Sequence, residues 1–251
     1  MSVNADSTPV ESLPPTRWGV GDAVAGLLIA NAAALFIGAA ILAATGYVEE
    51  GADGELPLTM IAVLQIPLWA GYLGAPLWAA KRKGNGVVAD FGLRMEGWDV
   101  LRGIGAGLGT QIIAIPLLYV VLFAITDALG WEYDQDLSAV ARDLTDKATD
   151  PVGVVLLVLI VAIAAPIIEE LFFRGLLLRA IEKRSGPRWA LWASSLVFGA
   201  VHLQLLQFPA LTLIGLVLGW LTLRYGRLGP AIWAHIAFNS VATITLLVDA
   251  T

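Results

Sequence analysis

Residues 151–175 read PVGVVLLVLIVAIAAPIIEELFFRG, an apolar run in which two adjacent glutamates follow some eighteen uncharged residues. A helix needs about 20 apolar residues to cross the hydrocarbon core of a bilayer, and this run supplies them. A carboxylate at membrane depth is costly, so Glu169 and Glu170 predict a functional site with a partner nearby. The stretch therefore predicts a membrane helix and also the place where the chemistry of the chain lies.

The rest of the chain has the same apolar character. Of its 251 residues, 58% are hydrophobic and 14% are charged, and the mean hydropathy is +0.77. Soluble domains have about 45–50% apolar and about 25% charged residues. The apolar runs are continuous rather than alternating, which disfavours a β-barrel. We therefore predict an all-α, polytopic transmembrane helix bundle. The absence of cysteine excludes disulfides, thiolate metal sites and a cysteine nucleophile.

Seven membrane spans are predicted, and an eighth would result if the fourth run broke at Pro166. Isolated polar residues in the early spans (Asn31, Gln65 and Gln111) are interpreted as helix–helix hydrogen bonders. Residues 1–19 are expected to form a disordered polar tail, and residues 20–251 a membrane-embedded domain. The expected spans are 20–46, 57–80, 101–129, 152–178, 189–206, 208–224 and 229–248.

The charge of the loops predicts the orientation of the chain. Basic residues gather after the second, fourth and sixth spans, whereas the alternate loops are acidic. By the positive-inside rule the basic loops face the cytoplasm, which places the N-terminus inside and the C-terminus outside. The compact chain is typical of a prokaryotic, multi-pass protein of the cell membrane. Its expected surroundings are the lipid bilayer, and no feature predicts binding of nucleic acid.

The glutamate pair belongs to the pattern Glu169-Glu170-x-x-x-Arg174. Residues four apart share a helix face, so Glu170 and Arg174 can pair. Glu169 is rotated by about 100° from Glu170 on an ideal helix, so the two carboxylates cannot do the same job. We expect Glu169 to act as a general base and Glu170 to position or ligate, with Arg174 holding one of them ionised.

The two histidines of the chain each lie four residues from a partner, in the pairs Phe198/His202 and His235/Asn239. Histidines can ligate a metal or orient a water, and the amide of Asn239 suits a developing oxyanion. Phe198 is interpreted as a core residue or a substrate contact. With the glutamates these groups make up the inventory of amide hydrolysis. The depth of the histidines in their spans favours a cavity open toward the cytoplasm.

These patterns resemble those of the CPBP (CAAX protease and bacteriocin-processing, or Abi) intramembrane endopeptidases. The family pattern EExxxR, FxxxH and Hxxx(N/D) stands here as EELFFR, FGAVH and HIAFN, and the resemblance covers about residues 150–248. It implies an intramembrane protease in which Glu169 and His202 activate a water, while His235 and Asn239 stabilise the oxyanion. The family's usual label is metalloprotease. A divalent metal such as zinc, held by Glu169, His202 and His235, is therefore one expectation, and a metal-free glutamate mechanism is the other.

The predicted function is hydrolysis of a peptide bond in a membrane-associated protein or peptide, either lipidated or not. Two alternatives stay open at this point. A non-catalytic bacteriocin-immunity or scaffold protein would depend on packing glycines such as Gly107 rather than on Glu169. A proton-coupled transporter would use Glu169 and His202 as a relay, although the chain shows none of the internal repeats from which many transporters are built.

Overall fold

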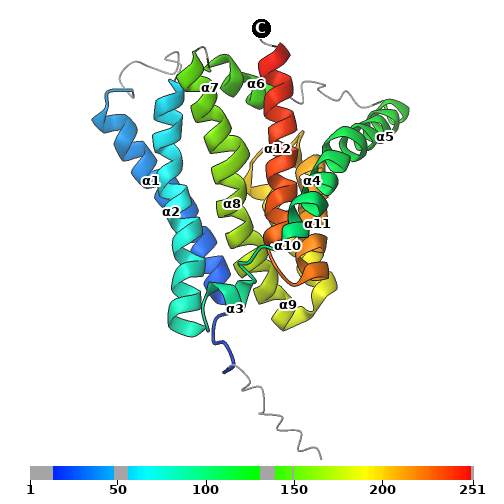
Figure 1. Cartoon of the computed structure of the whole chain (residues 1–251). Helices are drawn as coiled ribbons and strands as arrows, with labels where there is room; N and C mark the ends of the chain where they lie inside the picture. The colour runs from blue at the N-terminus through cyan, green and yellow to red at the C-terminus, as the bar shows by residue number, and fades with distance from the viewer. Residues whose placement is uncertain (1–13, 48–55, 131–138, 149, 250–251) are drawn as a thin grey trace, which may run out of the picture.

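The computed structural model describes residues 14–47, 56–130, 139–148 and 150–249. All regular structure in these residues is helical, and most of the long helices stand side by side as a bundle (Figure 1). The predicted all-α class is confirmed. The α-helices are α1 (Val20–Ala44), α2 (Leu58–Lys83), α3 (Val87–Phe91), α4 (Gly97–Gly109), α5 (Ile115–Ala128), α6 (Ala139–Asp146), α7 (Pro151–Leu157), α8 (Ala165–Glu170), α9 (Arg179–Ser185), α10 (Pro187–Val201), α11 (Phe208–Tyr225) and α12 (Gly229–Asp249).

Short π-helical segments join several of these helices without interrupting their path. Segment η1 (Thr110–Ala114) joins α4 to α5, while η2 (Val158–Ala164) and η3 (Leu171–Leu178) join α7, α8 and α9. The fourth predicted span is therefore one continuous 35-residue helix, Pro151–Ser185. Pro166 stands in the first turn of α8, directly after η2, and the helix does not break there, so the eighth span does not form.

Six helices in the described parts of the chain are long and apolar enough to cross a membrane. The fifth predicted span, 189–206, differs from the prediction. Helix α10 has 15 residues and ends at Val201, which corresponds to about 22 Å and is shorter than the hydrocarbon core. The apolar residues that follow, 202–207, form a turn that leads into α11.

The two ends of the bundle differ in charge. Helices α2, α9 and α11 end at the lower end in Figure 1, where α4, α10 and α12 begin. The described chain starts at this end and α12 finishes at the opposite one, as an odd number of traverses requires. We call the lower end the basic end, after Arg17, Lys81, Arg82, Lys83, Arg94, Arg102, Arg179, Lys183, Arg184, Arg188, Arg224 and Arg227.

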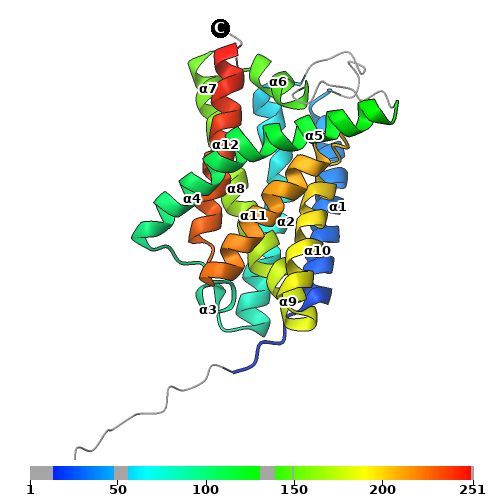
Figure 2. The same cartoon turned by 90° about the vertical axis from the view of Figure 1, so that its right-hand side faces the viewer.

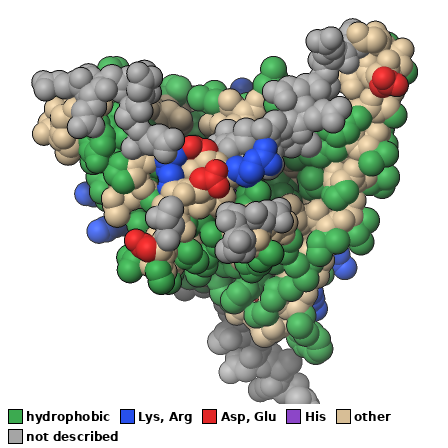
Figure 3. All heavy atoms as spheres, turned by 90° about the horizontal axis from the view of Figure 1, so that it is seen from above, with side chains coloured by type: hydrophobic (Ala, Val, Ile, Leu, Met, Phe, Trp, Pro, Cys, Tyr) green, Lys and Arg blue, Asp and Glu red, His purple; other side chains and the backbone are tan. Residues whose placement is uncertain are grey.

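The outer surface of the bundle is apolar, as a lipid-facing surface must be. Leu28 and Phe36 of α1 are 64% and 71% exposed, and Ile113 and Leu117 of the α4–α5 helix are 66% and 61% exposed. This last helix runs diagonally across the bundle in Figure 2. Viewed from above, hydrophobic side chains surround a small group of charged ones near the centre of the opposite end (Figure 3).

The start of the chain is packed against the basic end. Residues 1–13 of the predicted tail lie outside the described residues, but Trp18 is only 4% exposed and contacts the ring of Phe91 at a centroid distance of 5.1 Å. The ammonium group of Lys183 lies 3.8 Å from the Trp18 ring centroid and donates to the Trp18 carbonyl oxygen at 2.7 Å. Trp18, which the prediction placed in a disordered tail, is therefore packed against the bundle.

Helices α4 and α12 pack closely, which fixes the helix that carries the third motif. A Cβ added at Gly103 or Gly107 would clash with α12 at Trp233 or Ala234. At the basic end, Arg227 donates to both carboxylate oxygens of Asp99, at 2.9 and 2.7 Å. This hydrogen bonding raises the pKa of Arg227. This pair of hydrogen bonds holds the turn before α12 against the start of α4.

Candidate active site

The adjacent glutamates point in different directions from the middle of the 35-residue helix. The side chain of Glu169 is 17% exposed and lines a cavity. The side chain of Glu170 is 0% exposed and does not line that cavity. The separation follows from the rotation of about 100° per residue in a helix. Only Glu169 can therefore meet a molecule in the cavity directly.

Glu170 is compensated inside the protein by Arg174, one turn along the same helix. Arg174 Nη1 lies 3.0 Å from Glu170 Oε1, and both side chains are at most 1% exposed. The guanidinium group also lies 4.3 Å from the ring centroid of Phe198 and donates from Nη2 to the carbonyl oxygen of Gly215 at 3.3 Å. The i,i+4 spacing thus supplies the partner that a buried carboxylate needs, as predicted.

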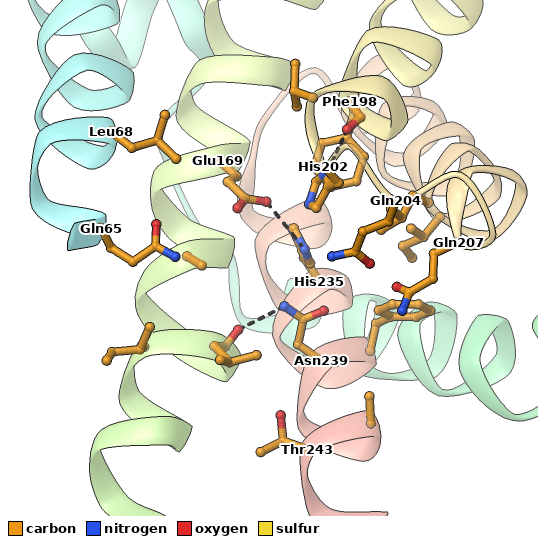
Figure 4. A pocket seen from close by; sticks show the side chains of 18 of the residues that line it. Gln65, Leu68, Glu169, Phe198, His202, Gln204, Gln207, His235, Asn239 and Thr243 are labelled. Carbon is orange, nitrogen blue, oxygen red and sulfur yellow. Dashed lines mark hydrogen bonds and ion pairs between the residues drawn. The ribbon is translucent and has the colours of Figure 1, made fainter. Parts of the chain in front are cut away.

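Each histidine is oriented through its Nδ1 atom. His235 Nδ1 lies 3.0 Å from Glu170 Oε1, and His202 Nδ1 lies 2.7 Å from the carbonyl oxygen of Phe198. Carbonyl and carboxylate oxygens only accept hydrogen bonds, so Nδ1 carries the proton in both rings. The Nε2 atoms remain for the cavity. His235 Nε2 lies 3.9 Å from Glu169 Oε2, and Figure 4 shows both rings grouped with Glu169.

Phe198 serves as a platform for this group rather than as an open surface. Its ring centroid lies 4.8 Å from that of His202 and 5.7 Å from that of His235. It borders the cavity but is only 1% exposed. The geometry therefore favours the core interpretation of Phe198 over that of a substrate contact.

Asn239 is held by a carbonyl group that a proline leaves free. The N–H of Ala165 bonds to the carbonyl oxygen of Ile160, five residues earlier. The next residue is Pro166, which has no N–H, so in this register the carbonyl of Val161 lacks a backbone donor. Asn239 Nδ2 donates to that oxygen at 2.9 Å. A second N–H on the same amide remains for a ligand in the cavity.

The cavity has a volume of about 400 Å³ and extends away from the basic end. Helix α12 contributes His235, Asn239, Thr243 and Leu246, in order toward the opposite end of the bundle, and Thr145 of α6 also lines the cavity. Toward the basic end the fully buried side chains of η3 close it. The predicted opening toward the basic end is not confirmed, because the aromatic and leucine side chains after Glu170 fill that space.

Part of the chain matches a known protein family. Residues 151–241 match the family described as "Type II CAAX prenyl endopeptidase Rce1-like". Over this segment the chain is similar to the CAAX prenyl endopeptidase family. The matched segment contains both glutamates, Arg174, both histidines and Asn239.

Two curated relatives cover a similar part of the chain. "Putative membrane peptidase YdiL" of Bacillus subtilis (strain 168) is 31% identical over 142 residues, which are 56% of this chain and 58% of that protein. "Uncharacterized 24.3 kDa protein" of Escherichia coli is 31% identical over 145 residues, 55% of this chain and 64% of that protein. The chain thus spans less than two thirds of the length of these relatives. No solved structure matches it significantly.

Several polar residues of the cavity were not identified by sequence reasoning. Gln204 and Gln207 come from the turn after α10, and Gln65 and Tyr72 come from α2, outside the segment matched to the CAAX prenyl endopeptidase family. Gln65 was interpreted as a helix–helix hydrogen bonder, but the described residues offer its side chain no hydrogen-bond partner. The signal that could have found the other two is the polar pair beside His202 in HLQLLQ.

The backbone of this turn is adapted to the site. Leu203 has φ +55, a left-handed conformation that residues other than glycine rarely adopt. Leu203 and Leu205 are 91% and 86% exposed, while His202 and Gln204 line the cavity. Tyr119 of α5 donates its hydroxyl to the carbonyl oxygen of Leu206 at 3.0 Å. The turn therefore separates a polar cavity wall from an apolar outer face.

The predicted metal set is only partly assembled. The free Nε2 atoms of His202 and His235, with Nδ1 held by a carbonyl and a carboxylate, have the outer-shell support that metal-bound histidines usually have. In the described part of the chain, however, no three His, Cys, Asp or Glu side chains are grouped so that they could hold a metal ion. The arrangement as it stands does not fit a three-ligand site, and the chemistry below uses no metal.

Proposed function

We propose that the chain is an intramembrane endopeptidase that hydrolyses a peptide bond of a membrane-associated protein or peptide. The observation that carries this proposal is the division between Glu169, which faces the cavity, and Glu170, which is neutralised by Arg174 and orients His235. One carboxylate is thus available for chemistry while the other fixes a histidine beside it. The similarity of residues 151–241 to the CAAX prenyl endopeptidase family supports a peptidase at this site.

In the proposed reaction a water lies between Glu169 and the histidines. The separation of 3.9 Å between Glu169 Oε2 and His235 Nε2 is too long for a direct hydrogen bond, but a water can contact both atoms. Glu169 takes a proton from this water while the water oxygen attacks the carbonyl carbon of the substrate. The carbon–nitrogen bond then breaks, and Glu169 returns the proton to the leaving amine.

The negative oxygen formed during the attack needs hydrogen-bond donors. Asn239 offers its second amide N–H, since the first is held by Val161. His235 offers a further N–H whenever its ring is protonated at both nitrogens. Aromatic rings pack around the site, and the ring centroids of Phe172 and Phe173 lie 5.1 Å apart. This packing keeps the donor groups in place and limits water to the cavity.

We further propose that the basic end faces the cytoplasm, as the positive-inside rule favours. The cavity then extends toward the outer half of the bilayer. A prokaryotic cell membrane is the proposed location, and a membrane protein or peptide, with or without a lipid group, is the proposed substrate.

Cleavage of fluorogenic peptides by the purified protein tests the proposal, with prenylated and unprenylated peptides compared. Glu169→Gln should lower the rate by about 10²–10⁴-fold, because this is the usual contribution of a general base. Glu182→Gln is the matched control, since Glu182 lies on the same helix, pairs with Arg179 and does not line the cavity. Unchanged cleavage by Glu169→Gln would contradict the proposal. Repeating the cleavage assay in the presence of a metal chelator tests the predicted metal requirement separately.

A further inference from the structure

The cavity presents amide side chains on facing walls. Gln65 projects from α2 on one side, and Gln204 and Gln207 project from the turn after α10 on the other, as Figure 4 shows. The described residues offer no hydrogen-bond partner to the side chains of Gln65 and Gln204. Amide groups without a hydrogen-bond partner inside an apolar bundle cost free energy unless water or a ligand binds them. Two such groups on opposite walls therefore indicate a ligand that is polar along two edges.

An extended peptide has this property. Its N–H and C=O groups project to both sides of the strand, and each needs a partner once the strand leaves water. Most backbone groups of the surrounding helices are bonded within their own helix, and the carbonyl of Val161 is bonded by Asn239, so they offer few partners. A glutamine side chain carries both a donor and an acceptor, so it can bond a peptide group with both. Gln65 and Gln204 thus replace the neighbouring strand that a peptide meets in a sheet.

The charge of the cavity limits which part of a peptide can enter. The lining residues in the described chain include no lysine or arginine, and the only carboxylate among them is Glu169. A free C-terminal carboxylate would be buried there without a lysine or arginine partner and close to the negative charge of Glu169, which is unfavourable. An internal peptide segment carries no such charge.

We propose that the cavity binds an internal, uncharged segment of its substrate in extended form through the amides of Gln65 and Gln204, and excludes a free C-terminal carboxylate. This inference rests on the proposed function, because it takes the cavity as the substrate site. It also narrows the substrate class, since a C-terminal CaaX sequence ends in a free carboxylate.

Direct binding tests the inference without requiring cleavage. The probes are three acylated, fluorescent apolar heptapeptides of one sequence. The first ends in a carboxamide and the second in a carboxylate. The third ends in a carboxamide and has alternate peptide nitrogens methylated. Fluorescence anisotropy measures their binding to the Glu169→Gln protein in detergent. The carboxamide should bind at least about tenfold more tightly than either other probe, because each of these loses partners or buries an unpaired charge.

Variants assign the effect to the two walls. Gln65→Leu and Gln204→Leu should each weaken binding of the carboxamide peptide by about fivefold or more. Gln111→Leu is the matched control, because Gln111 also lies in a membrane helix but does not line the cavity. Three results would each overturn the inference. The carboxylate and carboxamide peptides could bind equally well, the Gln65 and Gln204 variants could bind the carboxamide peptide as tightly as the parent protein, or no probe could bind.

The same peptides separate this inference from the proposed function. If the wild-type protein cleaves them without preference for the carboxamide, the inference fails and the peptidase remains. If the peptides bind with the expected preferences but are never cleaved, the inference stands and the proposed hydrolysis fails.

Discussion

The buried ion pair between Glu170 and Arg174 provides the sharpest test of how the site is held. Replacing Arg174 by methionine fills much of the same volume but leaves Glu170 without its cation. Both side chains are at most 1% exposed, so the unpaired carboxylate should cost about 3–5 kcal/mol of unfolding free energy. The substitution also removes the hydrogen bond to Gly215 and the contact with Phe198. For a chain of this length we expect the melting temperature to fall by roughly 6–20 °C.

The double variant Glu170→Gln/Arg174→Met should be more stable than Arg174→Met alone, because no buried charge is left unpaired. Replacing a buried ion pair by neutral groups is often close to neutral in stability, so the interaction energy of the cycle should be at least about 2 kcal/mol. The assay is thermal unfolding of the purified protein in detergent, followed by the fluorescence of its nine tryptophans.

A control on the same helix separates this effect from the loss of any arginine. Arg179 pairs with Glu182 at 2.8 Å, but these side chains are 16% and 30% exposed. Arg179→Met should therefore cost about 1 kcal/mol or less, because both partners of this pair keep some contact with water. Additive effects of the Glu170 and Arg174 substitutions, or equal costs at Arg174 and Arg179, would refute the account of Glu170 as a buried, charge-compensated group.

Two further predictions concern the packing and the orientation of the bundle. Gly107→Ala should destabilise the protein by about 1–3 kcal/mol, because the added methyl group clashes with the backbone of Ala234. Gly105→Ala should not, since nothing lies within 4 Å of its added Cβ, and thermal unfolding of the two variants checks the contrast. Because the chain has no cysteine, single cysteines report topology directly. In intact cells, a membrane-impermeant thiol reagent should label Asp146→Cys at the opposite end and leave Ser185→Cys at the basic end unlabelled until the cells are opened, and the reverse pattern would overturn the proposed orientation.

Local arguments predicted the parts of the site that depend on one helix. Hydrophobic runs long enough to span a bilayer fixed the helical class, since no other open structure satisfies its backbone there. The i,i+4 rule predicted the pairing of Glu170 with Arg174, and the helical rotation predicted that Glu169 would face elsewhere. These relations hold within a single helix and so need no knowledge of its neighbours.

Features that depend on several helices were missed. The direction of the cavity is set by which side of Glu169 the packed side chains fill, and the side chains of η3 fill the basic side. Gln65 and Gln204 line the same cavity although they lie far apart in sequence. Hydropathy also extended the fifth span through residues 202–207, because a turn rich in leucine has the composition of a membrane helix.

That turn also bears on how water is available at the site. Helix α10 is about 22 Å long, so its end at Val201 lies within the depth of the hydrocarbon core rather than at its surface. Non-helical backbone is tolerated at such depth only where it is buried in protein or lines a cavity that holds water. Here Tyr119 caps one carbonyl of the turn, and the polar side chains of His202 and Gln204 face the cavity. The interruption of α10 thus creates a polar pocket inside an apolar bundle, and a hydrolase that works within the bilayer needs such a pocket, because its second substrate is water.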